Sequence, residues 1–65
     1  MNWEQIAGSW KQFKGKIKEK WGKLTDDELD WIEGNRNRLV GKIQEKYGKS
    51  KEEAEKEADK YLEGM

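Results

Sequence analysis

The fold follows from residues 10–29, which read WKQFKGKIKEKWGKLTDDEL. Apolar side chains recur at every third or fourth position up to the glycine at 22, and this spacing is typical of one face of an α-helix. The same spacing begins upstream, and the complete stripe comprises Trp3, Ile6, Trp10, Phe13, Ile17, Trp21 and Leu24. We therefore expect one long amphipathic helix that ends at Gly22, because glycine readily adopts the left-handed conformation that ends many helices.

Thr25 marks the beginning of a second, acidic helix. Glu28 stands three residues later, where a capping box forms: the hydroxyl and the carboxylate each accept a hydrogen bond from a free backbone N–H. Leu29 and Ile32 form the short inner face of this helix, and Gly34 ends it.

Residues 34–57, GNRNRLVGKIQEKYGKSKEEAEKE, repeat the arrangement 26 positions later. A third helix is expected to end at Gly48, and Ser50 caps a fourth with Glu53 in the box position. The inner faces of these helices comprise Leu39, Val40, Ile43 and Tyr47, then Ala54, Ala58, Tyr61 and Leu62. The sequence thus predicts an all-α fold, a small four-helix domain of two packed helical hairpins from an internal duplication. The single domain spans residues 1–65, with repeat halves at about 8–33 and 34–62.

The composition leaves little apolar material for a core. The chain has 65 residues, of which 43% are charged and 32% hydrophobic, and 14 basic residues balance 14 acidic ones. A domain of this size buries only about 60% of the surface of its unfolded chain. We therefore expect the large aromatic side chains to be turned inward and to dominate the core. These are Trp3, Trp10, Trp21, Trp31, Phe13, Tyr47 and Tyr61.

Few residues offer chemistry. Cysteine and histidine are absent, which excludes disulfides, the usual zinc and haem sites, and Cys or His nucleophile chemistry. The hydroxyls of Ser9, Thr25 and Ser50 have no histidine to activate them, and two of the three serve as helix caps. The acidic run is best interpreted as a helix first turn that complements the dipole, rather than a calcium loop. It consists of Asp26, Asp27, Glu28, Asp30 and Glu33. We expect no enzyme activity, cofactor, metal site or small-molecule substrate.

Nucleic-acid binding is the alternative function. Basic residues gather on the first and third helices and at the glycine–lysine turns, and GKSKEEA at residues 48–54 loosely resembles the turn of helix-hairpin-helix modules. The candidate phosphate contacts are Arg36, Arg38, Lys42, Lys49 and Lys51. A chain of zero net charge lacks the strong basic field of such binders, so this function is not favoured.

The chain shows no feature of a membrane protein or a secreted one. The first residues lack the basic start, apolar run and small-residue cleavage site of a signal peptide, and no stretch approaches the roughly 20 apolar residues of a membrane span. We therefore expect a cytoplasmic protein.

Residues 10–29 and 34–57 together closely resemble the CsbD-like family of bacterial stress-response proteins. The likeness includes the glycine–lysine turn, the threonine cap and the second copy, and covers nearly the whole chain. The resemblance implies a small four-helix domain that is abundant in stationary phase or under general stress. It implies no molecular activity, so no catalytic or binding residues are transferred. We expect a non-enzymatic general stress-response protein with a protective or solubilising role and partners of unknown identity.

Overall fold

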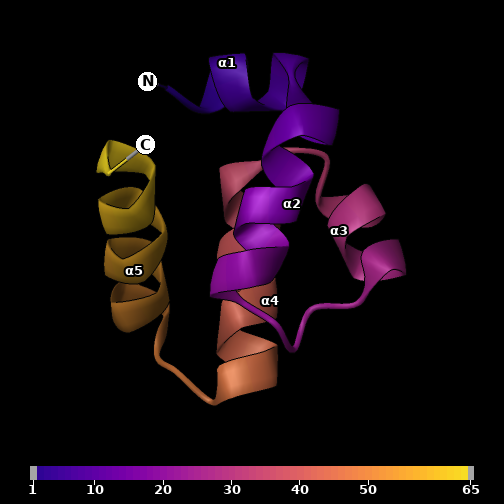
Figure 1. Ribbon diagram of the computed structural model, residues 1–65. Coiled ribbons are helices and arrows are strands. Elements are labelled where there is room, and N and C mark those ends of the chain that lie inside the picture. The colour runs from indigo at the N-terminus through magenta and orange to yellow at the C-terminus, as the bar shows by residue number, and fades with distance from the viewer. Residues whose placement is uncertain (1, 65) are drawn as a thin grey trace.

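The computed structural model describes residues 2–64. Within this range the chain forms five α-helices and no strand, which confirms the all-α prediction. The helices are α1 (Trp3–Gly8), α2 (Trp10–Lys20), α3 (Asp26–Ile32), α4 (Arg36–Tyr47) and α5 (Lys51–Glu63). In Figure 1, α5 and α3 lie on either side of the α2–α4 pair, and α1 runs across one end.

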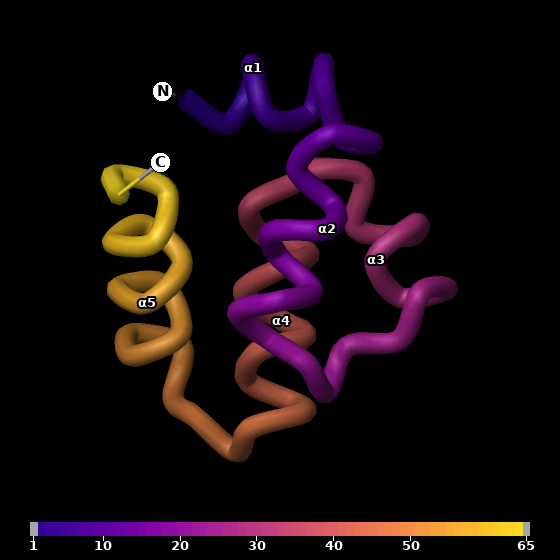
Figure 2. Tube along the Cα trace, in the orientation of Figure 1, coloured from indigo at the N-terminus to yellow at the C-terminus, as the bar shows by residue number. Residues whose placement is uncertain are grey.

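The predicted long first helix is wrong, because the chain leaves the helical conformation at Ser9. Gly8 and Ser9 are both weak helix formers, so a break here costs little. The backbone groups at the break remain bonded: the Ser9 N–H donates to the carbonyls of Gln5 and Ile6, and the Ser9 carbonyl accepts from Gln12. The break lets α1 turn away from the axis of α2 (Figure 2).

The arrangement as two similar packed hairpins is not confirmed. The second half is a close antiparallel pair, α4 and α5, of 12 and 13 residues. The first half is divided into α1 and α2, and its acidic helix α3 has only seven residues. The acidic helices therefore differ in length by almost a factor of two, and the halves are not copies in three dimensions.

The predicted caps between the helices are confirmed. The Glu28 N–H donates to the Thr25 hydroxyl at 3.1 Å, and the Thr25 N–H donates to the Glu28 carboxylate at 2.9 Å. Ser50 forms the same reciprocal pair with Glu53. Because each box joins residues three positions apart, these contacts arise from local sequence alone.

The core is mainly aliphatic. Its buried members from α2 to α5 are Ile17, Trp21, Leu24, Leu29, Ile32, Leu39, Val40, Ile43, Ala54 and Ala58. Among the aromatic side chains of residues 2–64, Trp21 alone is fully buried; Trp3, Trp10, Tyr47 and Tyr61 pack against the core from its edge. The expectation that the aromatic rings dominate the interior is therefore wrong in part.

Trp31 is the clearest departure from that expectation. Its side chain is 51% exposed, whereas Leu29 and Ile32 in the same helix are buried. Trp31 stands two positions after Leu29, which places it about 200° around the helix. Leu29 and Ile32 therefore face the core, and the indole lies on the outside.

Gly34 fixes the position of α1. It has a φ of +77°, and a Cβ built on it would lie 2.5 Å from the Cα of Ala7. The backbone of α1 thus passes directly against the turn between α3 and α4, and Ile6 beside this contact is fully buried. Only glycine permits both the left-handed conformation and this close approach.

Within residues 2–64, no helix is both long and apolar enough to cross a membrane.

Candidate functional site

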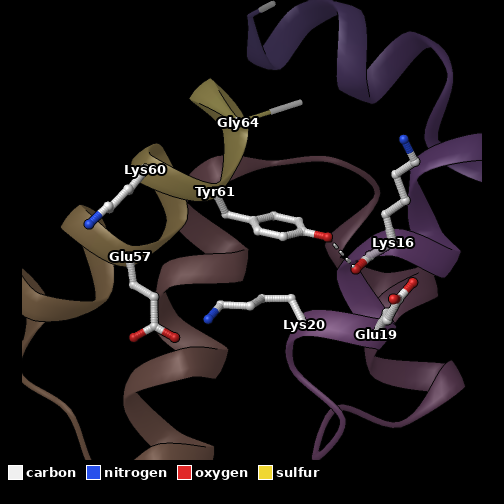
Figure 3. Close-up of a pocket in the computed structure, with 7 residues that line it drawn as sticks. All are labelled: Lys16, Glu19, Lys20, Glu57, Lys60, Tyr61 and Gly64. Atoms are coloured by element: carbon white, nitrogen blue, oxygen red, sulfur yellow. Dashed lines mark hydrogen bonds between the residues drawn. The ribbon is translucent and has the colours of Figure 1, made fainter.

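A groove of about 610 Å³ lies between α2 and α5 (Figure 3). One side comes from the last two turns of α2 and the other from the last two turns of α5. The lining residues are Lys16, Glu19, Lys20, Glu57, Lys60, Tyr61 and Gly64. The groove combines an aromatic ring with charged side chains of both signs.

Three contacts hold the walls of this groove together. The Tyr61 hydroxyl donates a hydrogen bond of 2.9 Å to the carbonyl of Lys16. Its ring meets that of Trp21 edge to face, with 5.2 Å between the centroids. The Trp21 Nε1–H donates to Glu57 at 2.7 Å. These contacts join α2 and the residue after it, Trp21, to α5. They hold the two walls of the groove at a fixed separation.

Both carboxylate oxygens of Glu57 contact other groups of the chain. One of its oxygens accepts from Trp21, and the other forms an ion pair with the Lys49 ammonium. Burial acts to raise the pKa of Glu57, but the hydrogen bonds from Lys49 and Trp21 outweigh it and hold the pKa below its ordinary value. Glu57 is therefore ionised at neutral pH with both oxygens already engaged.

The lysines of the groove are less closely paired, although the charge of Lys20 helps to lower the pKa of Glu57. Within residues 2–64, the ammonium groups of Lys16, Lys20 and Lys60 contact no carboxylate within ion-pair distance, no carbonyl and no aromatic face. Among the described residues, Lys11 and Lys51 are the other cations whose ammonium groups contact no carboxylate, carbonyl or aromatic ring. Three of these five residues line the groove, but in Figure 3 the Lys60 side chain points away from α2 and the Lys20 side chain points toward Glu57.

The five predicted nucleic-acid contacts do not form one surface. Arg36 faces α5, where its guanidinium binds Asp59 twice at 2.8 Å and Glu55 at 3.2 Å. Lys49 also faces α5 through its ion pair with Glu57. Lys51 is exposed at the start of α5.

The fold does bring Arg38 and Lys42 together, over the exposed ring of Trp31. Their cationic groups lie 4.9 Å and 5.3 Å from the ring centroid. Arg38 also donates to the Trp31 carbonyl at 2.7 Å, and Lys42 approaches Glu28 at 3.4 Å. Four of the five candidate residues are therefore engaged with groups of the chain itself.

The acidic residues in the first turn of α3 stabilise the beginning of that helix. The hydrogen bond from the Thr25 backbone, followed by those from Lys46, the Thr25 side chain and Lys42, lowers the pKa of Glu28 to about 2 against the opposing effect of burial. Glu28 consequently links the cap of α3 to two cations of α4, at 3.1 Å for Lys46. Within the described residues, no three acidic side chains are grouped as metal ligands.

Comparison with known proteins identifies the family. The CsbD-like family profile matches residues 4–56. The chain belongs to the CsbD-like family.

Curated relatives of this CsbD-like protein carry the label UPF0337. The UPF0337 protein YjbJ of Escherichia coli O6:H1 is 62% identical over 61 residues, which are 94% of this chain and 88% of the relative. A UPF0337 protein of Pectobacterium atrosepticum is 68% identical over 57 residues, covering 88% of this chain and 83% of the relative. One of Rhodopseudomonas palustris is 57% identical over 62 residues, covering 95% and 94%. These names state no substrate, reaction or partner, so they transfer no site residues.

Sequence reasoning missed the groove of this CsbD-like protein. Trp21 and Tyr61 were both expected on inner faces, but their contact joins positions far apart in the chain. The hydrogen bonds that join Glu57 to Trp21 and Tyr61 to Lys16 likewise span 36 and 45 positions. Residue spacing predicts contacts within one helix, and it carries no signal for these.

Proposed function

We propose that this CsbD-like protein is a non-enzymatic, cytoplasmic stress-response protein that shields other proteins from aggregation. The family resemblance supports the link to general stress. The observation that carries the proposal is the placement of charge: 43% of the residues are charged, yet none of the charged residues in 2–64 is buried. A small domain therefore presents a dense, hydrated shell of zero net charge.

This shell suggests how shielding works. Mixed charges of both signs keep a protein hydrated without a long-range field that attracts one class of partner. At high concentration, such molecules separate partly unfolded proteins and reduce the encounters between their apolar surfaces. Six of the 14 cations pair with acids within residues 2–64, and Arg36, Lys42 and Lys49 of the candidate nucleic-acid contacts are among them, which favours this passive role over the nucleic-acid alternative.

A protection assay tests the proposal. An enzyme that aggregates on heating or drying is treated with millimolar amounts of the protein or of an inert protein at equal mass. We expect less light scattering and more recovered activity with the CsbD-like protein. Protection no greater than that of the inert protein would refute the proposal.

A charge variant identifies the cause of protection. Glu52 and Lys56 form an exposed ion pair on α5, with side chains 81% and 78% exposed. Replacing both with glutamine, together with further exposed pairs, removes charge while the net charge stays zero. We expect protection to fall with each neutralised pair, and unchanged protection would separate the activity from the charged shell.

We also propose that residues 1–65 form one domain whose halves, about 8–33 and 34–62, descend from a duplicated helical unit. The repeated glycine and lysine positions and the matching caps at Thr25 and Ser50 support this origin. Neither half can bury its apolar face alone, so each half expressed separately is expected to lack helical circular dichroism, while a mixture of the two regains it. A half that is fully helical by itself would contradict the single-domain part of the proposal.

A further inference from the structure

We propose that the outer face of α3 and α4 around Trp31 is an interface between two copies of this chain, related by a twofold axis. We call this face the Trp31 patch. Its residues are Asp27 and Trp31 of α3 and Arg38, Gly41 and Lys42 of α4. This inference goes beyond the shielding function and does not depend on it.

Trp31 supplies the apolar centre of the patch. Among the large hydrophobic side chains of residues 2–64, it alone is exposed, to 51%. The cationic groups of Arg38 and Lys42 lie over its ring, at 4.9 Å and 5.3 Å from the centroid. Both cations come from α4, so they cover the ring from that side and leave its outward side open. A tryptophan held in this way is suited to be the central anchor of a protein–protein interface.

Gly41 leaves a hollow next to this ring. Together with Trp31, Arg38 and Lys42 it lines a depression of about 330 Å³. A Cβ built on Gly41 would meet no atom within 4 Å, so the fold of a single copy does not require glycine there. Glycine inside a helix is also less favourable than alanine. A second molecule that enters the hollow accounts for the glycine, because the missing side chain lets a partner approach the backbone of α4.

The charges on the two sides of Trp31 point to a second copy as the occupant. On the α4 side, Arg38 donates to the Trp31 carbonyl, and within residues 2–64 it contacts no carboxylate at ion-pair distance. Lys42 is balanced by Glu28 and Glu45, at 3.4 Å and 3.5 Å. The guanidinium of Arg38 is therefore the unmatched positive charge on this side.

The opposite side of Trp31 is acidic. Asp27 stands four positions before Trp31, so the two are neighbours on the outer face of α3. Three carboxylates of α3 share Lys14: its hydrogen bond with Asp30, and then the charges of Asp30, Asp26 and Asp27, raise the pKa of Lys14 against the effect of burial. Only Asp30 pairs with it directly. Asp27 is therefore available to a cation from another molecule.

A twofold axis through the patch brings the two sides together. Contacts across such an axis are reciprocal, so Arg38 of each copy faces Asp27 of the other, and the two Trp31 rings meet near the axis. A standard interface takes about 800 Å² and about 20–30 residues from each partner, and this area is about a fifth of the 4294 Å² surface of the molecule. The Trp31 patch is smaller, so we expect a weak dimer with a Kd of about 0.1–1 mM.

An NMR dilution series from about 2 mM to about 0.05 mM at low salt tests the proposal. We expect the Trp31 indole N–H and the amides of α3 and α4 to shift with concentration, and diffusion in the concentrated sample to approach that of twice the 7.7 kDa monomer mass. The Trp31→Ala variant should associate at least about tenfold more weakly. Association that survives this substitution would overturn the proposal. A Trp31 signal that ignores concentration would also overturn it, and a shift of that signal with a single-stranded oligonucleotide would assign the patch to nucleic acid instead.

Two charge-reversal variants test the reciprocal contact. Asp27→Arg and Arg38→Asp each place like charges opposite each other, so each variant alone should dimerise at least about tenfold more weakly than the wild type. An equimolar mixture of the two regains both pairs and should associate within about threefold of the wild type. All these side chains are exposed, and circular dichroism verifies the fold of each variant.

A second mixture controls for general charge attraction. Lys51→Asp changes the net charge as Arg38→Asp does, but Lys51 is exposed at the start of α5, outside the patch. Mixed with Asp27→Arg, it leaves like charges opposed at one of the two contacts, so we expect at least about tenfold weaker association than in the matched mixture. Equal association of the two mixtures would show attraction of net charge only and would overturn the interface.

Alanine at two open helix glycines separates docking from folding. Gly41→Ala fills the hollow, and Gly15→Ala adds the same methyl group to α2, outside the patch; neither Cβ has an atom within 4 Å. Both variants should raise the Tm of dilute protein, because alanine favours the helix. Only Gly41→Ala should weaken the dimer, by at least about threefold. An unchanged Kd for Gly41→Ala would show that no partner enters the hollow and would overturn the proposed docking.

Discussion

Replacing Gly34 with alanine is expected to detach α1 from the rest of the molecule. The new Cβ would lie 2.5 Å from the Cα of Ala7 and 2.8 Å from its backbone nitrogen. Both neighbours are backbone atoms, so no side-chain rotation relieves the overlap. Either α1 or the turn after α3 must move.

The structure sets the size of the effect. An L-residue in the left-handed conformation costs about 1–2 kcal/mol. Displacing α1 also exposes Ile6, which is fully buried, and this costs about 1.5–3 kcal/mol. The Gly34→Ala variant is therefore expected to lose roughly 2.5–5 kcal/mol of unfolding free energy.

Gly48 offers a matched control. It has a φ of +63°, but no atom lies within 4 Å of a Cβ built there. The Gly48→Ala variant thus carries the conformational cost of about 1–2 kcal/mol and no steric overlap. The two variants should differ by roughly the burial of Ile6, about 1.5–3 kcal/mol.

Thermal unfolding followed by tryptophan fluorescence measures both variants. Because 1 kcal/mol shifts the Tm of a domain of this size by about 4–8 °C, Gly34→Ala should melt at least about 6 °C below Gly48→Ala. NMR provides a local check, since the Ile6 amide should lose its native shift only in Gly34→Ala. Equal destabilisation of the two variants, or an unchanged Ile6 amide, would refute the reasoning.

Three further predictions concern the contacts between helices. Trp21→Phe keeps a ring against Tyr61 but removes the donor to Glu57, so urea unfolding should show a loss of about 1–3 kcal/mol; a wild-type midpoint would contradict the importance of this bond. The pKa of Glu28 is lowered to about 2, below its value in the unfolded chain, so its contribution to stability is present above about pH 4.5 and is lost as the pH falls toward 2. A carboxyl titration by NMR checks this, and a pKa near 4.5 would contradict it. Raising NaCl from about 10 mM to about 1 M should lower the Tm by screening the pairs of Arg36 and Glu28, and an unchanged Tm would show that these pairs add nothing to stability.

Local features of the fold were predictable because the interactions that cause them are local. The capping boxes at Thr25 and Ser50 join residues three positions apart, and both form as expected. Gly48 ends α4 in the left-handed conformation for the same kind of reason. The break at Ser9 was not predictable, since the apolar stripe from Trp3 to Leu24 continues across it.

The candidate site was less accessible to sequence reasoning. The sequence identifies Arg36, Lys42 and Lys49 as basic residues on suitable helices, yet their role depends on which acids lie opposite. Arg36 meets acids 19 and 23 positions away, and Lys42 meets Glu28 from another helix. A count of charges treats a paired cation and a free one alike.

The sequence by itself determined that this chain is helical, where its acidic helices begin, and which family it belongs to. Those properties depend on residue spacing, on capping groups and on positions read one after another along the chain. The tertiary structure alone decided that α1 folds over Gly34, that Trp21 is buried while Trp31 is exposed, and that Arg36 and Lys49 pair with acids of α5. These outcomes depend on the distances between helices, because steric overlap and ion pairing act over a few ångströms in space, whatever the separation along the chain.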